Sequence, residues 1–92
     1  MANFVTKKDG TRVPFDIEKI KHAVASSAME AEISEEEAKK AADEVANSIT
    51  ATFDGIEEVS STEIREKIMA ELEATHPIVA ESWRKYEEGK HE

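Results

Sequence analysis

Apolar residues recur at helical spacing in four stretches of the chain, and polar residues fill most of the positions between them. Spacings of three and four residues place each apolar set on one face of a helix. The four sets are Ile17, Ile20 and Val24; Ala38, Ala41, Ala42, Val45, Ile49 and Phe53; Ile64, Ile68 and Leu72; and Val79, Trp83 and Tyr86. The pattern predicts four amphipathic helices that share one core.

Capping signals indicate where these helices begin. Asp16 is of a residue type preferred at the N-cap and directly precedes the first apolar set. Ser34 followed by Glu37 has the spacing of a capping box, and Ser60 or Ser61 suits the start of the third helix. We therefore expect a helix to begin directly after each of these positions.

Breaker residues indicate where the helices end. The first helix should run to about Met29. Asp54-Gly55 ends the second helix, with Gly55 in the left-handed conformation at the C′ position. Pro77 ends the third helix and opens the fourth, because the missing N–H of a first-turn proline has no partner to lose. Gly89 is expected to end the fourth.

A β-hairpin is predicted ahead of the first helix. Asp9-Gly10 suits a two-residue turn with positive φ at both positions, so the flanking segments should pair between about Phe4 and Phe15. Residues 56–59 could add a short third strand. The predicted fold is α+β: one domain over residues 1–92, with four helices and a small two- or three-stranded sheet packed on one side.

Composition narrows the classes of function. The chain has no cysteine, which excludes disulfides and thiolate zinc sites and favours a reducing compartment. No apolar run approaches the roughly 20 residues of a membrane span, so we expect a cytoplasmic protein without a membrane partner. The net charge of −9 argues against nucleic acid, which needs clustered cations along its backbone. We find no catalytic constellation and no histidine spacing typical of a metal site, and predict that the chain is not an enzyme.

One cluster of cations remains, and the motifs around it carry a resemblance. VTKKDG forms a strand and turn, VPFD a second strand with its cap, and IEKI opens a helix. This order resembles the N-terminus of an ATP-cone domain, a nucleotide-binding regulatory module of ribonucleotide reductases and related proteins. GIEEVSSTEI and VAESWRKY follow in the family's order, so the resemblance covers nearly the whole chain. It implies reversible binding of ATP or dATP, with Mg²⁺, as an allosteric ligand.

The basic cluster consists of Lys7, Lys8, Arg12, Lys19 and Lys21. Lys19 lies in the first helical turn, where its amine can reach a phosphate held near the helix N-terminus. The resemblance implies nucleotide contacts at Lys7 and Lys8, beside Asp16, at the start of the third helix and at a basic position near the C-terminus. The predicted nucleotide-binding residues are Val5, Lys7, Lys8, Asp16, Lys19, Ile20, Ser61, Arg65 and Lys90.

Each of these residues also has a structural explanation. The lysines could be solvated, Val5 and Ile20 could belong to the core, and Arg65 could pair with Glu58 or Glu66. Where many ATP-cones continue the last helix with tyrosine and arginine, this chain has Tyr86-Glu87-Glu88. The alternative function is therefore an interaction module of the same fold that has lost the nucleotide.

The resemblance also implies partners. They would be a ribonucleotide reductase catalytic domain or subunit, acting in cis or in trans, with a homo-oligomer as a further option. Transcriptional repressors of the family carry a zinc ribbon, and the absence of cysteine argues against that branch.

Overall fold

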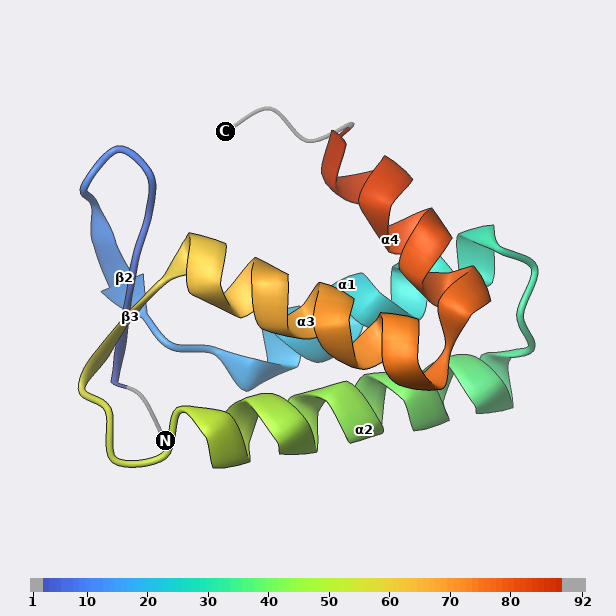
Figure 1. Cartoon of the computed structure of the whole chain (residues 1–92), viewed down its shortest axis with the longest axis horizontal. Helices are drawn as coiled ribbons and strands as arrows, with labels where there is room; N and C mark the ends of the chain where they lie inside the picture. Colours follow the sequence, from blue (N-terminus) through green and yellow to red (C-terminus); the bar gives the residue numbers. More distant parts are fainter. Residues whose placement is uncertain (1–2, 89–92) are drawn as a thin grey trace.

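The computed structural model describes residues 3–88, with side chains described to residue 85. Three strands and four helices follow one another within these residues (Figure 1). They are β1 (Phe4–Thr6), β2 (Arg12–Pro14), α1 (Ile17–Glu30), α2 (Glu35–Thr52), β3 (Glu58–Ser60), α3 (Ser61–Thr75) and α4 (Pro77–Glu88). The small sheet lies at the end of the helical layer where α1 and α3 begin. The predicted α+β arrangement is confirmed.

The three strands form a mixed sheet in the order β2-β1-β3. β1 pairs antiparallel with β2, with Val5 opposite Val13, and parallel with β3, with Val5 beside Val59. Parallel pairing of β1 with β3 needs a long connection between the two strands. β2, α1 and α2 supply it, because they lie between β1 and β3 in the sequence. The third strand is thus present, but it lies at Glu58–Ser60 rather than at residues 56–59.

The hairpin turn differs from the predicted two-residue turn. The Gly10 N–H donates to the Lys7 carbonyl at 2.9 Å, and the Lys7 N–H donates to the Thr11 carbonyl at 2.8 Å. Gly10 has a φ of 89°, whereas the φ of Asp9 is not positive. This is a three-residue loop, in which a type I turn is followed by a left-handed glycine. Asp9 instead accepts a hydrogen bond from the Thr11 N–H at 2.9 Å, which favours the tighter local turn.

The predicted caps are confirmed at the three helix starts. The side chain of Asp16 accepts from the Glu18 N–H, that of Ser34 from Glu37, and that of Ser60 from Glu63. Each bond satisfies one of the N–H groups that a helix start leaves without an intrahelical partner. Local chemistry therefore fixes where α1, α2 and α3 begin.

α1 and α2 end with different C-terminal capping arrangements. At α1, the Glu32 N–H donates to Met29 and the Ile33 N–H to Ala28, with Glu32 at a φ of 62°. This is a Schellman motif whose left-handed position holds a glutamate rather than a glycine. At α2, Phe53 is the C-cap, so Gly55, with a φ of 81°, lies in the following turn and not at C′. Gly89 lies outside the described residues.

The core gathers one face of every helix together with β3. Its most deeply buried large side chains are Val24, Val45, Ile49, Val59, Ile68 and Leu72. α1 is also tied to α4, because the Ser82 hydroxyl donates to the carbonyl of the fully buried Ser27 at 2.6 Å. Over residues 3–88, we find no helix with the length and apolarity that a membrane crossing requires.

Candidate functional site

A cavity of about 320 Å³ opens where the sheet meets the first turns of α1 and α3. Side chains of β1, β2, α1, α3 and α4, and of the residues that join the strands to the helices, surround it. The lining residues are Val5, Lys7, Val13, Pro14, Phe15, Asp16, Lys19, Ile20, Ala23, Ser61, Ile64, Arg65, Ile68 and Trp83. The volume is within the range of small-molecule sites.

Most of the predicted site residues meet at this cavity. Seven of the nine line it, namely Val5, Lys7, Asp16, Lys19, Ile20, Ser61 and Arg65. Lys8 lies in the hairpin turn and is not among the lining residues, and Lys90 lies outside the described residues. The structure therefore brings Lys7, but not Lys8, to the cavity.

Two helix N-termini face the cavity. Asp16 caps α1 and Ser61 is the first residue of α3, and both line the wall. The aligned peptide dipoles of each helix place partial positive charge at this end. Lys19 follows Asp16 by three residues, within the first turn of α1, so its ammonium adds to the positive field at the same place.

Three cationic side chains line the cavity from different elements. Lys7 directly follows β1, Lys19 belongs to α1 and Arg65 belongs to α3. The Arg65 guanidinium donates from Nη2 to the Ser61 hydroxyl at 3.2 Å, one helical turn away. Asp16 is a carboxylate on the same wall, and its Oδ1 already accepts the Glu18 N–H at 3.0 Å. The wall therefore favours an anion.

Other members of the predicted basic cluster are engaged elsewhere. The Arg12 Nε lies 3.1 Å from a carboxylate oxygen of Glu58, and the guanidinium lies over the Phe4 ring; Arg12 does not line the cavity. Lys21 lies 3.7 Å from both Glu18 and Asp43. The cluster thus contributes Lys7 and Lys19 to the cavity, while Arg65 arrives from α3.

The apolar part of the cavity is larger than the sequence indicated. Val5 and Ile20 are half-buried and pack against the core as well as lining the cavity. The core explanation is therefore confirmed, and the nucleotide contact of both residues stays a prediction. Trp83, only 3% exposed, lines the cavity from α4. We interpreted Trp83 as a core residue, and it is one, but it also faces the cavity.

Sequence reasoning missed the remaining lining residues. They are Val13, Pro14, Phe15, Ala23, Ile64 and Ile68, with Trp83. Val13 could have been found, because it is the strand partner of Val5 and paired residues point to the same side of a sheet. Trp83 could not, since its place depends on how α4 packs across α1 and α3.

Known proteins resemble this chain over most of its length. A sequence model described as the ATP cone domain matches residues 3–92. The transcriptional repressor NrdR of Lactobacillus helveticus is 38% identical over 68 residues, which cover 74% of this chain and 43% of the relative. NrdR of Lactobacillus acidophilus is 37% identical over the same shares. The chain therefore spans less than half the length of these curated relatives.

These relatives correct one step of the sequence analysis. Their name places them in the control of transcription, the branch that the absence of cysteine argued against. Because the match covers only 43% of each relative, a lack of cysteine in these 92 residues does not separate the chain from them. The family itself follows from the match to nearly every residue: the chain belongs to the ATP-cone family.

Proposed function

We propose that this chain reversibly binds an adenine nucleotide, ATP or dATP, in the cavity between the sheet and the starts of α1 and α3, as a regulatory ligand. The observation that carries the proposal is the convergence of Lys7, Lys19 and Arg65 on one cavity with an apolar wall. Although the chain has a net charge of −9, this wall carries three cations against the single carboxylate of Asp16, which gives it a local positive potential.

The polyphosphate would lie against the cations and the helix starts. Lys7 and Lys19 supply point charges, while Arg65 supplies a planar fork that can hold two phosphate oxygens at once. The Ser61 hydroxyl, on the same turn as Arg65, offers a further donor. Mg²⁺ would enter with the nucleotide, because it prefers phosphate oxygens and keeps several waters.

The base would occupy the apolar side of the cavity. Val5 and Ile20 present aliphatic surface there, and Trp83 presents an aromatic ring. A purine gains from burial and from contact with an aromatic face. The cavity thus offers separate surfaces for the two chemically different parts of a nucleotide.

The proposed role is that of a sensor within a larger regulatory system. The regulated protein could be a ribonucleotide reductase, in cis or in trans, or a repressor similar to the relatives above. Binding would link β1, α1, α3 and α4, since all four contribute to the cavity wall. A partner that contacts those elements would then experience the bound and free states differently.

Calorimetric titration of the 92-residue chain with Mg-ATP and Mg-dATP tests the proposal. Saturable binding is expected, weakened by about tenfold or more in Lys7→Ala and in Lys19→Ala, because each removes a charge-assisted contact. Lys39→Ala, on the exposed face of α2, removes the same charge away from the cavity and should bind as the wild type does. Absence of binding up to millimolar nucleotide, from a folded sample, would favour the interaction module instead.

A further inference from the structure

The opposite end of the helical layer carries an exposed apolar surface that the nucleotide site does not use. Here α1 ends, α2 begins, and α3 turns into α4 (Figure 1). A second cavity of about 250 Å³ lies at this end, with Ile33, Pro77, Ile78 and Val79 in its wall. Ile78 is 64% exposed, and Met29, in the last turn of α1, is 51% exposed. We refer to these five residues as the distal apolar face.

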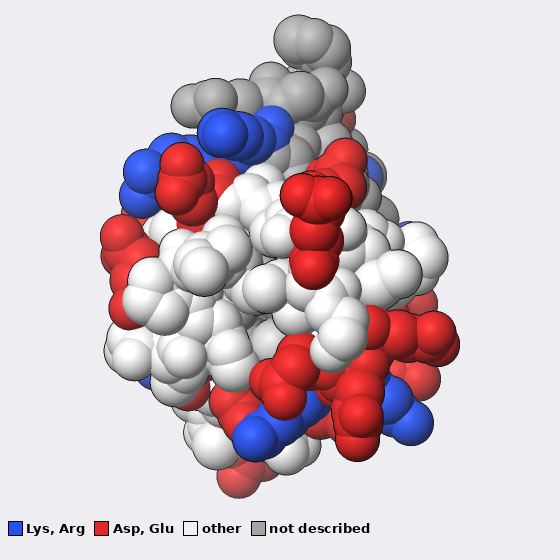
Figure 2. All heavy atoms as spheres, turned by 90° about the vertical axis from the view of Figure 1, so that its right-hand side faces the viewer, with Lys and Arg blue, Asp and Glu red and all other residues white. Residues whose placement is uncertain are grey.

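Acidic side chains border this surface on several sides. Figure 2 shows an uncharged centre with Asp and Glu on several sides, and with Lys and Arg at the upper left and among the acids at the bottom. Glu37 lines the cavity directly, and Glu35 and Glu36 share its helical turn. Glu30 and Glu32 are exposed at the end of α1, next to Met29 and Ile33.

Two of these acids occupy backbone positions at which glutamate is unfavourable. Glu30 is the last residue of α1, where the helix dipole favours cations, and the last turn of α1 holds no basic residue. Glu32 occupies a left-handed position, with a φ of 62°, that glycine adopts without strain. Neither residue is explained by helix stability. Such departures from local preference are expected at functional surfaces.

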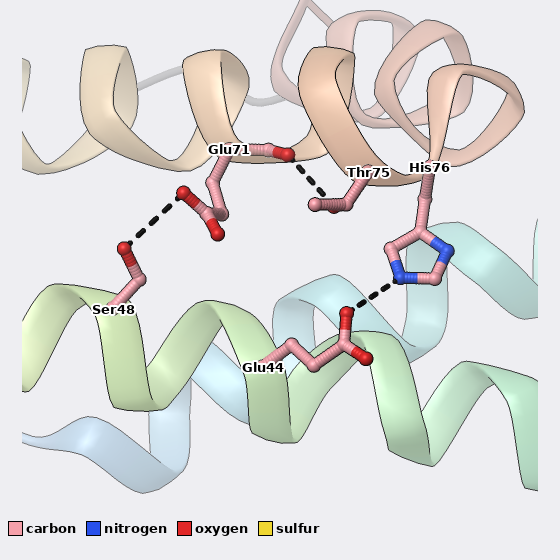
Figure 3. A network of polar contacts seen from close by, with 5 residues as sticks. All are labelled: Glu44, Ser48, Glu71, Thr75 and His76. Atoms are coloured by element: carbon pink, nitrogen blue, oxygen red, sulfur yellow. Dashed lines mark hydrogen bonds and ion pairs between the residues drawn. The ribbon is translucent and has the colours of Figure 1, made fainter.

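One wall of the cavity is held in place by polar contacts (Figure 3). His76, which lines the cavity, makes a 3.0 Å contact from Nε2 to the Glu44 carboxylate of α2. Ser48 donates to Glu71 at 3.2 Å, and the Thr75 hydroxyl donates to the Glu71 carbonyl at 2.7 Å. The contacts of Glu71 and His76 with α2 hold the junction of α3 and α4 against that helix, whereas the Thr75 bond lies within α3. The cavity is therefore largely formed before any partner arrives.

We propose that the distal apolar face docks a basic amphipathic helix of a protein partner, with the partner's apolar residues against Ile33 and Ile78 and its Lys or Arg side chains against the acidic border. Charge complementarity selects this occupant, because opposite potentials favour encounter and register. A second copy of the chain would bring an equally acidic border against the first. Helix-in-groove recognition uses apolar anchors at helical spacing, which the apolar residues of this cavity can receive.

A synthetic helical peptide of leucine and lysine, with leucines at helical spacing, serves as the probe. It is titrated against the ¹⁵N-labelled 92-residue chain, with a peptide of the same length in which glutamate replaces lysine as the charge control. The lysine peptide should bind and shift the amide signals of residues around 29–37 and 76–80. The glutamate peptide should not bind.

Ile78→Ser tests the site, and Ile56→Ser is the matched control. Both isoleucines are exposed, by 64% and 43%, and Ile56 lies in the connection between α2 and β3 at the other end of the molecule. Ile78→Ser should lower the affinity for the lysine peptide about tenfold, whereas Ile56→Ser should leave that affinity unchanged. Met29→Ser, made as a separate single variant, should also weaken binding of the lysine peptide.

Two results would overturn the proposal. One is equal binding by the wild type and by both distal variants, which would show that the peptide responds only to overall negative charge. The other is self-association of the chain, by sedimentation equilibrium, that Ile78→Ser abolishes, which would assign the face to a second copy. The nucleotide titration is independent of either result, because none of its proposed contacts lies on this face.

Discussion

Arg65 and Ser61 are joined by a hydrogen bond across one turn of α3, and both side chains line the cavity proposed for the nucleotide. The bond holds the guanidinium near the start of the helix, where phosphate would lie. Ser60, not Ser61, supplies the N-cap through its bond to the Glu63 N–H. Ser61 can therefore be changed without removing the cap.

This arrangement predicts different losses for two variants. Ser61→Ala should weaken nucleotide binding by about threefold to tenfold, because Arg65 loses one hydrogen bond and the site loses one donor. Arg65→Lys should cost about tenfold or more although the charge is kept, since an ammonium cannot replace the planar fork. Calorimetry gives both affinities.

Arg84→Lys is the control for the second variant. Arg84 is exposed on α4, with Nη2 3.5 Å from Glu73, and does not line the cavity. The same chemical change there should leave nucleotide affinity intact. Equal effects at Arg65 and Arg84 would contradict a direct role for Arg65.

Trp83 should report binding directly. It is the single tryptophan of the chain, it is 3% exposed, and it lines the apolar side of the cavity. A purine placed against its ring would change its emission, and the change should saturate at the affinity found by calorimetry. In Lys7→Ala the same change should appear only at higher nucleotide concentration. An emission that stays constant while heat of binding is observed would place the base elsewhere.

The parts of the fold that rest on local chemistry could be predicted from the sequence. Asp16, Ser34 and Ser60 cap their helices through contacts within three residues, and Pro77 opens α4 as its position in the sequence indicates. The hairpin was also correctly placed. Its turn was not, because Asp9 forms a local hydrogen bond that competes with the left-handed conformation.

The residues of the candidate site also differ in how far the sequence predicts their positions. Lys7, Asp16 and Lys19 lie within one short segment, so the motif alone brought them together. Arg12 does not join the other cations at the cavity. It pairs with Glu58 of β3, a residue 46 positions further along the chain. Trp83 entered the cavity through the packing of α4. Contacts between distant segments depend on the tertiary arrangement, which periodicity does not specify.

The Asp9 carboxylate predicts a pH dependence of the hairpin. The hydrogen bond from the Thr11 N–H, followed in importance by that from the Thr11 side chain, holds the pKa of Asp9 below its ordinary value. A lowered pKa in the folded state means that the charged form is preferred there. The resulting stabilisation is present above the ordinary pKa of about 3.9 and is lost as the pH falls through the lowered value.

Comparison with Asp9→Asn isolates this contribution. The amide oxygen can still accept the Thr11 N–H, but the side chain no longer titrates. The difference in free energy of unfolding between wild type and variant should therefore be constant near neutral pH and shrink at acidic pH. Urea unfolding between about pH 6 and pH 2 measures it. A difference that grows as the pH falls would contradict the assigned cause.

Glu32→Gly should stabilise the fold. A left-handed conformation costs an L-residue about 1–2 kcal/mol, and the greater freedom of glycine in the unfolded chain offsets part of the gain. The net increase in the free energy of unfolding should be about 0.5–1 kcal/mol. Glu30→Gly, two residues earlier and inside the last turn of α1, should instead destabilise by up to about 1 kcal/mol.

The same pair of variants tests why Glu32 is a glutamate. If the residue serves the acidic border, Glu32→Gly should be more stable in urea and yet bind the leucine-lysine peptide more weakly, with a smaller dependence on salt. Glu30→Gly removes the same charge from the border and should lower the affinity for the peptide by a similar factor. Unlike Glu32→Gly, it should also lower the free energy of unfolding. Peptide binding that follows stability rather than charge would show that the border does not select the partner.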